Sequence, residues 1–177
     1  LNMLAYNDFI ERCEKALQRA TKLTEKTGGG ILLITEGVYG MTGGLGRLDL
    51  ICELKKKYNF RILIDDAHGF GSMGPNGRGT SEHYGVMDEI HLYFGAYAKS
   101  MACIGGFVAG DKDIINYLRY NLRSQIYAKS LPMPIVEGCL KRLDIIRKGH
   151  DKREKLFKIT RALQDGLRER GFDIGVA

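Results

Sequence analysis

Two short apolar runs, each followed directly by polar or charged residues, limit the folds that this chain can adopt. The first run covers residues 61–64 and is followed by Asp65 and His68. The second covers residues 90–94 and leads to Lys99. Continuous apolar runs of this length are typical of buried strands in α/β sheets, which bind ligands beyond the carboxyl ends of their strands. We therefore expect Asp65, His68 and Lys99 to gather at one edge of a sheet.

Further apolar runs alternate with helical spacings along the chain. The pattern predicts a helix over residues 8–26, a strand over 31–34 that is covered on both faces, and a helix over 48–58. Together with the 61–64 strand this order forms a strand–helix–strand unit. It predicts an α/β fold with a mostly parallel sheet flanked by helices. The remaining predicted elements are a strand at 105–110, helices over 111–127, 135–148 and 152–170, and a strand that begins in 171–177.

Charge and cysteine content exclude several classes of function. Lys and Arg number 27 against 21 Asp and Glu, but the two signs are interleaved along the predicted helices, which indicates solvated helix faces and no nucleic-acid partner. The four cysteines are widely separated and include no C-x-x-C pair, so neither a zinc site nor a disulfide framework is indicated. No apolar run is long enough to cross a bilayer. Reduced thiols in a cytoplasmic protein without a transmembrane segment are the expectation.

Two glycine-rich segments allow more than one interpretation. The segment 35–46 follows a predicted strand, and its glycines indicate either close approach of the backbone to a ligand or a mobile loop. The segment 69–74 matches the dinucleotide-binding pattern G-x-G-x-x-G. That pattern requires a helix to begin at the glycines, whereas residues 75–79 prolong the loop here. The match is therefore interpreted as accidental.

Asp65, His68 and Lys99 are compatible with four interpretations. Taken singly, each is an ordinary structural residue: a loop-capping acid, a satisfied histidine and a surface lysine. A metal site is disfavoured because the ligand spacing is loose, and a phosphate-binding module leaves the lysine without a role. A lysine in a glycine-rich pocket can instead form a Schiff base with pyridoxal phosphate, provided that a carboxylate holds the ring nitrogen protonated. This fourth interpretation is the only one that uses all three residues.

An ordered set of motifs resembles the α-oxoamine synthases, a family of fold-type I pyridoxal phosphate enzymes. The motifs lie at residues 65–71, 77–80, 98–102 and 104–107, and the resemblance extends over the whole chain. It implies the large cofactor-binding domain of an aspartate aminotransferase-like fold over residues 1–170, with a C-terminal domain beginning at 171–177. It also implies a homodimer.

The resemblance assigns a role to each of the three residues. Asp65 would pair with the pyridine nitrogen, His68 would contact the ring oxygen and the substrate, and Lys99 would be the Schiff-base lysine and proton carrier. The implied reaction condenses a small amino acid, glycine or serine, with an acyl-CoA and releases CoA and CO2, giving an α-aminoketone. The alternatives are 8-amino-7-oxononanoate synthase, a cysteate acyltransferase, or a non-catalytic regulatory subunit.

The chain departs from the family pattern at several cofactor contacts. The family usually has threonine where this chain has Ala96, serine at Gly40, an acid at Thr42, and Ser-Thr at residues 128–129. Three of these changes remove hydroxyl groups that contact the cofactor in the family, while Lys129 adds a cation near the expected phosphate. The departures bear more on which reaction is catalysed than on whether the cofactor is bound.

Overall fold

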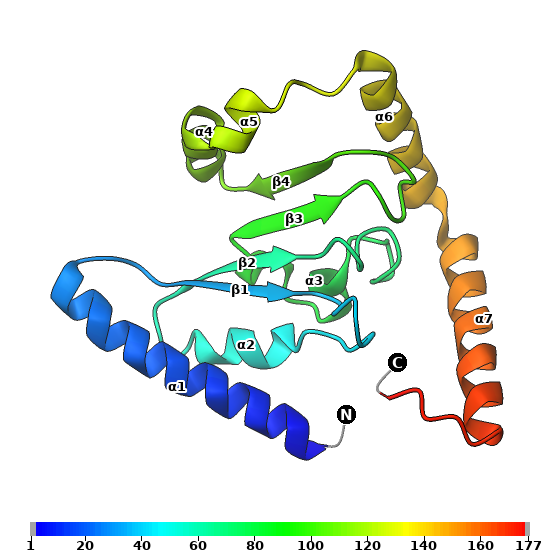
Figure 1. Ribbon diagram of the computed structural model, residues 1–177, viewed down its shortest axis with the longest axis horizontal. Helices are drawn as coiled ribbons and strands as arrows, with labels where there is room; N and C mark the ends of the chain where they lie inside the picture. Colours follow the sequence, from blue (N-terminus) through cyan, green and yellow to red (C-terminus); the bar gives the residue numbers. More distant parts are fainter. Residues whose placement is uncertain (1–2, 176–177) are drawn as a thin grey trace.

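A four-stranded mixed sheet forms the centre of the computed structural model, which describes residues 3–175 and the side chains of residues 8–175 (Figure 1). The strands lie in sequence order and are β1 (Leu32–Glu36), β2 (Arg61–Asp65), β3 (Leu92–Ala96) and β4 (Gly106–Gly110). The pairs β1–β2 and β2–β3 are parallel, whereas β4 runs antiparallel to β3. The prediction of a mostly parallel sheet flanked by helices is confirmed.

Helices connect and follow the strands. They are α1 (Met3–Thr27), α2 (Leu48–Leu54), α3 (Thr80–His83), the 3-10 turn Met87–Glu89, α4 (Lys112–Asn121), α5 (Arg123–Tyr127), α6 (Met133–Lys148) and α7 (His150–Glu169). The helix predicted over 111–127 is divided at Leu122, whose backbone is extended. Among the described helices, none combines the length and the apolar character needed to cross a membrane.

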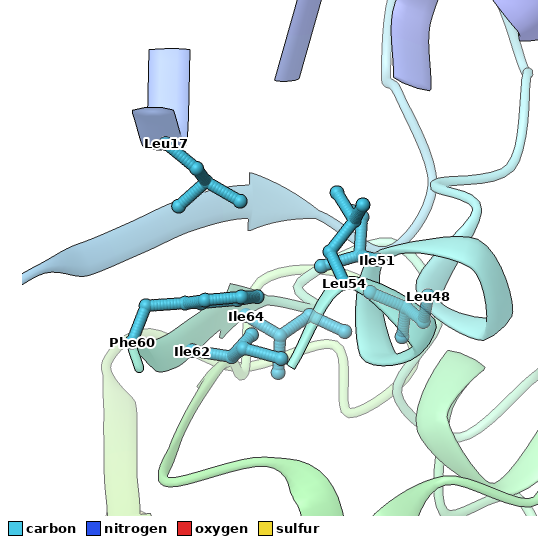
Figure 2. Close-up of a cluster of buried hydrophobic side chains, with 7 residues drawn as sticks. All are labelled: Leu17, Leu48, Ile51, Leu54, Phe60, Ile62 and Ile64. Atoms are coloured by element: carbon cyan, nitrogen blue, oxygen red, sulfur yellow. The ribbon is translucent and has the colours of Figure 1, made fainter. Parts of the chain in front are cut away.

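The core lies between one face of the sheet and the helices α1 and α2. Ile62 and Ile64 of β2 are fully buried there, beside Leu48, Ile51 and Leu54 of α2 and Leu17 of α1 (Figure 2). The alternation of a strand sends Ile62 and Ile64 to this face, while Leu63 and Asp65 point to the other. The sheet is thereby fixed against α2, which directs the carboxyl ends of the parallel strands to one edge.

The opposite face of the sheet is only partly covered in the described part of the chain: Leu92 of β3 is buried on it, but the outer strands are exposed. Leu32 and Ile34 of β1 are 49% and 65% exposed, and Val108 of β4 is 37% exposed. The prediction that the strand at 31–34 is covered on both faces is therefore wrong for the described residues. Within this apolar run, only Ile31 and Leu33 pack against the core.

The last described residues also differ from the prediction. Residues 171–175 form turns and irregular backbone, so the strand predicted to begin here is not present in them. Residues 176 and 177 lie outside the described residues. The domain boundary expected at residue 170 stays a prediction.

Candidate functional site

The three parallel strands end together at one edge of the sheet. In the register of the sheet, Glu36 of β1 pairs with Asp65 of β2, and Asp65 pairs with Phe94 of β3. His68 follows in the connection after β2, and Lys99 follows in the connection after β3. The residues that the sequence singled out thus lie at or just beyond neighbouring strand ends, as predicted for a ligand site.

Asp65 is the last residue of β2 and is half-buried. Its Oδ1 atom accepts a hydrogen bond of 3.1 Å from the backbone N–H of Ala67. Its Oδ2 atom accepts none from the residues that the structure describes. One carboxylate oxygen therefore stays free to accept a proton donor on the open face of the sheet.

Asp66 has a different environment from its neighbour because successive strand residues point to opposite sides. It is fully buried and accepts hydrogen bonds from the backbone N–H of Thr80 at 2.7 Å, from the Thr80 hydroxyl and from the Tyr93 hydroxyl at 2.8 Å. Burial raises the pKa of Tyr93, and the adjacent Asp66 carboxylate raises it further, so the phenol stays a donor. Sequence reasoning did not single out Tyr93. The two-residue period of a strand is the sequence signal that could have distinguished the buried Asp66 from the part-exposed Asp65.

Glycines surround the Asp66 carboxylate. A Cβ atom at Gly37, Gly69 or Gly79 would overlap an oxygen of Asp66, and at the first two positions it would also approach the Thr80 hydroxyl closely. Gly79 additionally has a φ of 99°, which disfavours other residues. The glycines allow the connection after β1 and the connection between β2 and α3 to close on one buried carboxylate, so Asp66 organises two loops around the site.

His68 is exposed, and its ring lies against Gly40 of the loop after β1. A Cβ atom at Gly40 would lie 2.5 Å from Nε2 of His68. The backbone N–H of Gly40 donates a 3.2 Å hydrogen bond to the Glu36 carboxylate, which holds this loop in place. The missing side chain at position 40 therefore gives the imidazole its space.

Lys99 lies in a tight turn between β3 and β4. The backbone N–H of Ala102 donates to the carbonyl of Lys99 at 2.9 Å, and that of Cys103 donates to the carbonyl of Tyr97 at 2.9 Å. Met101 is 2% exposed and anchors the turn, whereas the Lys99 side chain is exposed and has no hydrogen bond or ion pair to any described residue. The turn thus presents a free amine at the strand edge.

Comparison with known proteins identifies the family. The family model described as aminotransferase class I and II matches residues 14–176. The chain belongs to this family.

This aminotransferase-family chain is similar to several acyltransferases. It is 58% identical over 170 residues to the cysteate-C-fatty acyltransferase of Capnocytophaga ochracea. The aligned region covers 96% of this chain and 40% of that relative. It matches the structure of Sphingomonas wittichii serine palmitoyltransferase with a TM-score of 0.78 at 34% identity, over 82% of the chain and 36% of that protein. A structure described as serine palmitoyltransferase with a PLP internal aldimine matches with a TM-score of 0.76 at 35% identity, over 80% and 36% of the two chains.

These relatives are α-oxoamine synthases, so the resemblance found in the sequence is confirmed. The chain spans less than half the length of each of them. Within the span that it shares, the fold of the aminotransferase-family chain is that of the solved relatives.

The groups at the strand edge fit pyridoxal phosphate. The cofactor needs an amine for its aldehyde and an acceptor for its protonated ring nitrogen. Lys99 offers an exposed amine and Asp65 a free carboxylate oxygen, while the imidazole of His68 has no hydrogen-bond partner among the described residues. No group of three or more metal-ligating side chains occurs in the described part of the chain.

Proposed function

We propose that the full-length protein is a pyridoxal phosphate-dependent acyltransferase that condenses a small amino acid with an acyl-CoA and releases CoA and CO2. The observation that carries the proposal is that Asp65, with a free carboxylate oxygen, ends β2, and that Lys99, with a free amine, lies in the connection after the neighbouring strand β3. The 58% identity to a cysteate acyltransferase and the likeness to serine palmitoyltransferases support the same reaction class.

Each residue would perform one task in this reaction. Bound pyridoxal phosphate supplies an electron sink that stabilises negative charge on the α-carbon of the amino acid. Asp65 would accept a hydrogen bond from the protonated ring nitrogen and keep it charged. Lys99 would link covalently to the cofactor aldehyde and, once displaced by the amino acid, carry the α-proton. His68 would orient the bound amino acid from the side of Gly40.

Among the amino acids considered, cysteate is favoured over glycine and serine. The identity of 58% to the cysteate-C-fatty acyltransferase exceeds the identities of 34–39% to serine palmitoyltransferases. The retained Lys99, Asp65 and His68 argue against a non-catalytic regulatory subunit. We propose cysteate as the amino acid and a fatty acyl-CoA as the second substrate.

The remaining expectations belong to the same proposal. A homodimer and the domain boundary near residue 170 are carried over from the resemblance. A cytoplasmic location fits the four cysteines, all of which are free thiols in the structure.

The first experiment tests the lysine. The full-length protein incubated with pyridoxal phosphate should show the visible absorbance band of the lysine-linked cofactor, and borohydride should trap the cofactor on the peptide that contains Lys99. The Lys99→Ala variant should lose both signals because it has no amine at this position. Lys112→Ala, which changes an exposed lysine on α4, is the matched control and should keep them. Retention of the band by Lys99→Ala would reject the proposal.

The second experiment tests the amino acid. Cysteate, serine, glycine and alanine are each titrated into the protein loaded with pyridoxal phosphate. We expect cysteate to shift the absorbance spectrum at the lowest concentration, and the complex to release CO2 only when an acyl-CoA is added. A preference for serine or glycine would keep the reaction class and replace the substrate.

A further inference from the structure

The connection after β1 turns back on itself and is anchored beside the end of β2. Within it, the backbone N–H of Gly46 donates to the carbonyl of Gly37 at 2.7 Å, and that of Gly37 donates to the carbonyl of Asp65 at 2.8 Å. Residues 40–42 form a turn at the far end of this connection. Figure 1 shows the connections after β1 and β2 at the same end of the sheet. The turn is therefore held near the residues that follow Asp65.

The side chain of Glu36 ties this turn to the end of β1. Glu36 is the last residue of β1 and pairs in register with Asp65, so the two acids lie on the same face of the sheet. Its Oε2 atom accepts a 3.2 Å hydrogen bond from the backbone N–H of Gly40. Water can replace an acceptor at an exposed turn, so the bond contributes modestly to stability and mainly limits where the turn lies.

The turn limits the imidazole of His68. A Cβ atom at Gly40 would lie 2.5 Å from Nε2, 3.1 Å from Cε1 and 3.3 Å from Cδ2, so the outer edge of the ring faces the backbone of Gly40. The base of the side chain is held by its own connection, in which the N–H of Ala67 donates to Asp65 at 3.1 Å and the Ser72 hydroxyl donates to the carbonyl of His68 at 3.1 Å. The ring is thus restrained at both ends.

We propose that Glu36 is a positioning residue for His68 and acts through the backbone of Gly40. The carboxylate supplies the acceptor that holds the turn, and the turn limits the free edge of the imidazole. Loss of the acceptor releases the turn and gives the ring room to rotate away from the amino acid. The effect on amino acid binding rests on the proposed function, whereas the contact between the turn and the ring does not.

The first test measures access to the imidazole in the full-length protein without pyridoxal phosphate. Diethyl pyrocarbonate acylates imidazole nitrogens, and trypsin releases His68 in peptide 62–78, where it is the only histidine. Glu36→Ala should raise the rate of His68 acylation about 2- to 10-fold, the factor that corresponds to the loss of one hydrogen bond. Glu36→Gln should restore the unsubstituted rate, because the amide oxygen can accept the same bond. The exposed His83 is the control histidine, Glu137→Ala at an exposed position is the control variant, and neither should show a change.

Gly40→Ala tests the same contact from the other side. The φ of Gly40 lies outside the left-handed region, so the backbone can accept alanine, but the added Cβ would displace the imidazole. We expect the rate of His68 acylation to rise in this variant also, with that of His83 unchanged. This second variant decides the inference even where Glu36→Ala impairs folding.

The second test uses the full-length protein loaded with pyridoxal phosphate. Glu36→Ala should raise KM for the amino acid about 2- to 10-fold and change kcat little, and Glu36→Gln should restore KM. A lower kcat at unchanged KM would overturn the positioning role, because it would place Glu36 in the chemical step. Absence of cofactor binding in the unsubstituted protein would reject the proposed function and leave the acylation test intact.

The acylation rates can also overturn the inference. Equal acylation of His68 in Glu36→Ala and in the unsubstituted protein would show that the hydrogen bond does not restrain the ring. Faster acylation in Glu36→Gln, equal to that in Glu36→Ala, would exclude the acceptor as the cause. Acceleration at His83 together with His68 would indicate general loosening of the fold in place of a local release.

Discussion

At the scale of single residues, the two adjacent acids at the end of β2 have different roles: Asp66 stabilises the fold, and Asp65 is available for chemistry. Asp66 is fully buried and satisfied by Thr80 and Tyr93, whereas Asp65 is half-buried with one free oxygen. A buried carboxylate is tolerated only where donors replace the lost water. The donors of Asp66 are therefore a structural requirement for the loops around the candidate site.

The Tyr93 hydroxyl offers a clean test of this requirement. Tyr93→Phe removes the 2.8 Å hydrogen bond to Asp66 and keeps the ring, whose centre lies 6.0 Å from that of Phe107. Loss of one hydrogen bond to a buried charge should lower the free energy of unfolding by about 1.5–3 kcal/mol. Urea unfolding of the full-length protein measures the change. Tyr120→Phe is the control, because Tyr120 is 75% exposed, and an equal effect of both substitutions would contradict the prediction.

At the scale of elements, α3 holds the loop that follows the site. The Glu82 carboxylate accepts hydrogen bonds from the backbone N–H groups of Asn76 and Arg78, both at 3.0 Å, and from the Asn76 side chain at 2.8 Å. Burial alone would raise the pKa of Glu82, but these hydrogen bonds outweigh it and hold the pKa below its ordinary value. The ionised side chain therefore fastens residues 76–78 to a helix of only four residues.

The lowered pKa predicts how this fastening depends on pH. A carboxyl group with a lowered folded-state pKa stabilises the fold above its unfolded pKa, about 4.3 for Glu, and this stabilisation is lost as pH falls through the folded pKa. The thermal midpoint of the unsubstituted protein should thus fall toward that of Glu82→Gln between about pH 5 and pH 3. Glu137→Gln, at an exposed position on α6, should show no such convergence. A constant difference between Glu82→Gln and the unsubstituted protein across this range would contradict the prediction.

The elements also show what the sequence could and could not predict. Short apolar runs located all four strands, and helical spacing located α1, α2, α6 and α7, because burial of one face leaves a periodic trace. The direction of β4 and the open face of β1 leave no such trace, since they depend on which elements pack nearby. The break at Leu122 carries neither proline nor glycine as a signal, and α3 is too short to show a period.

The residues of the candidate site could be selected from the sequence, but the hydrogen bonds that hold the surrounding loops could not. Asp65, His68 and Lys99 could be selected because they follow apolar runs and match family motifs. The hydrogen bonds of Tyr93 and Thr80 to Asp66 join residues 27 and 14 positions away in the sequence. Contacts across such separations are created by the fold, so no local pattern indicates them.

At the scale of the whole molecule, the described chain combines one packed and one open sheet face. The open face carries the exposed side chains of Leu32, Ile34 and Val108, and Asp65 points to the same side. The chain spans 36–40% of the length of the cysteate acyltransferase and of the two serine palmitoyltransferase structures. Asp65 therefore presents its free carboxylate oxygen on the side of the sheet that the described residues leave partly uncovered.

The position of α7 relative to the rest depends on one buried arginine. Arg153 is 8% exposed, and its guanidinium donates to the carbonyl of Ile146 on α6 at 2.7 Å and to that of Pro75 in the loop at 2.9 Å. It joins α6, α7 and the loop before α3, while Leu156, Ile159 and Leu163 on α7 are about half or more exposed. Among the described residues, few apolar contacts could therefore hold α7 in place if the hydrogen bonds of Arg153 were lost.

Replacement of Arg153 by methionine should loosen α7 without disturbing the sheet. Methionine keeps much of the side-chain length but cannot donate, so the carbonyls of Ile146 and Pro75 each lose a hydrogen bond from a charged group, which should lower the free energy of unfolding by about 1.5–3 kcal/mol. Trypsin should then cleave the full-length variant faster after Lys148, at the α6–α7 junction, than it cleaves the unsubstituted protein. Arg161→Met, at an exposed position on the same helix, is the control and should leave the cleavage rate unchanged. Because Arg153 donates to Ile146 and Pro75 and to none of Asp65, His68 or Lys99, cofactor absorbance should persist in both variants. Its loss in Arg153→Met together with faster cleavage would show that the position of α7 and the site are coupled.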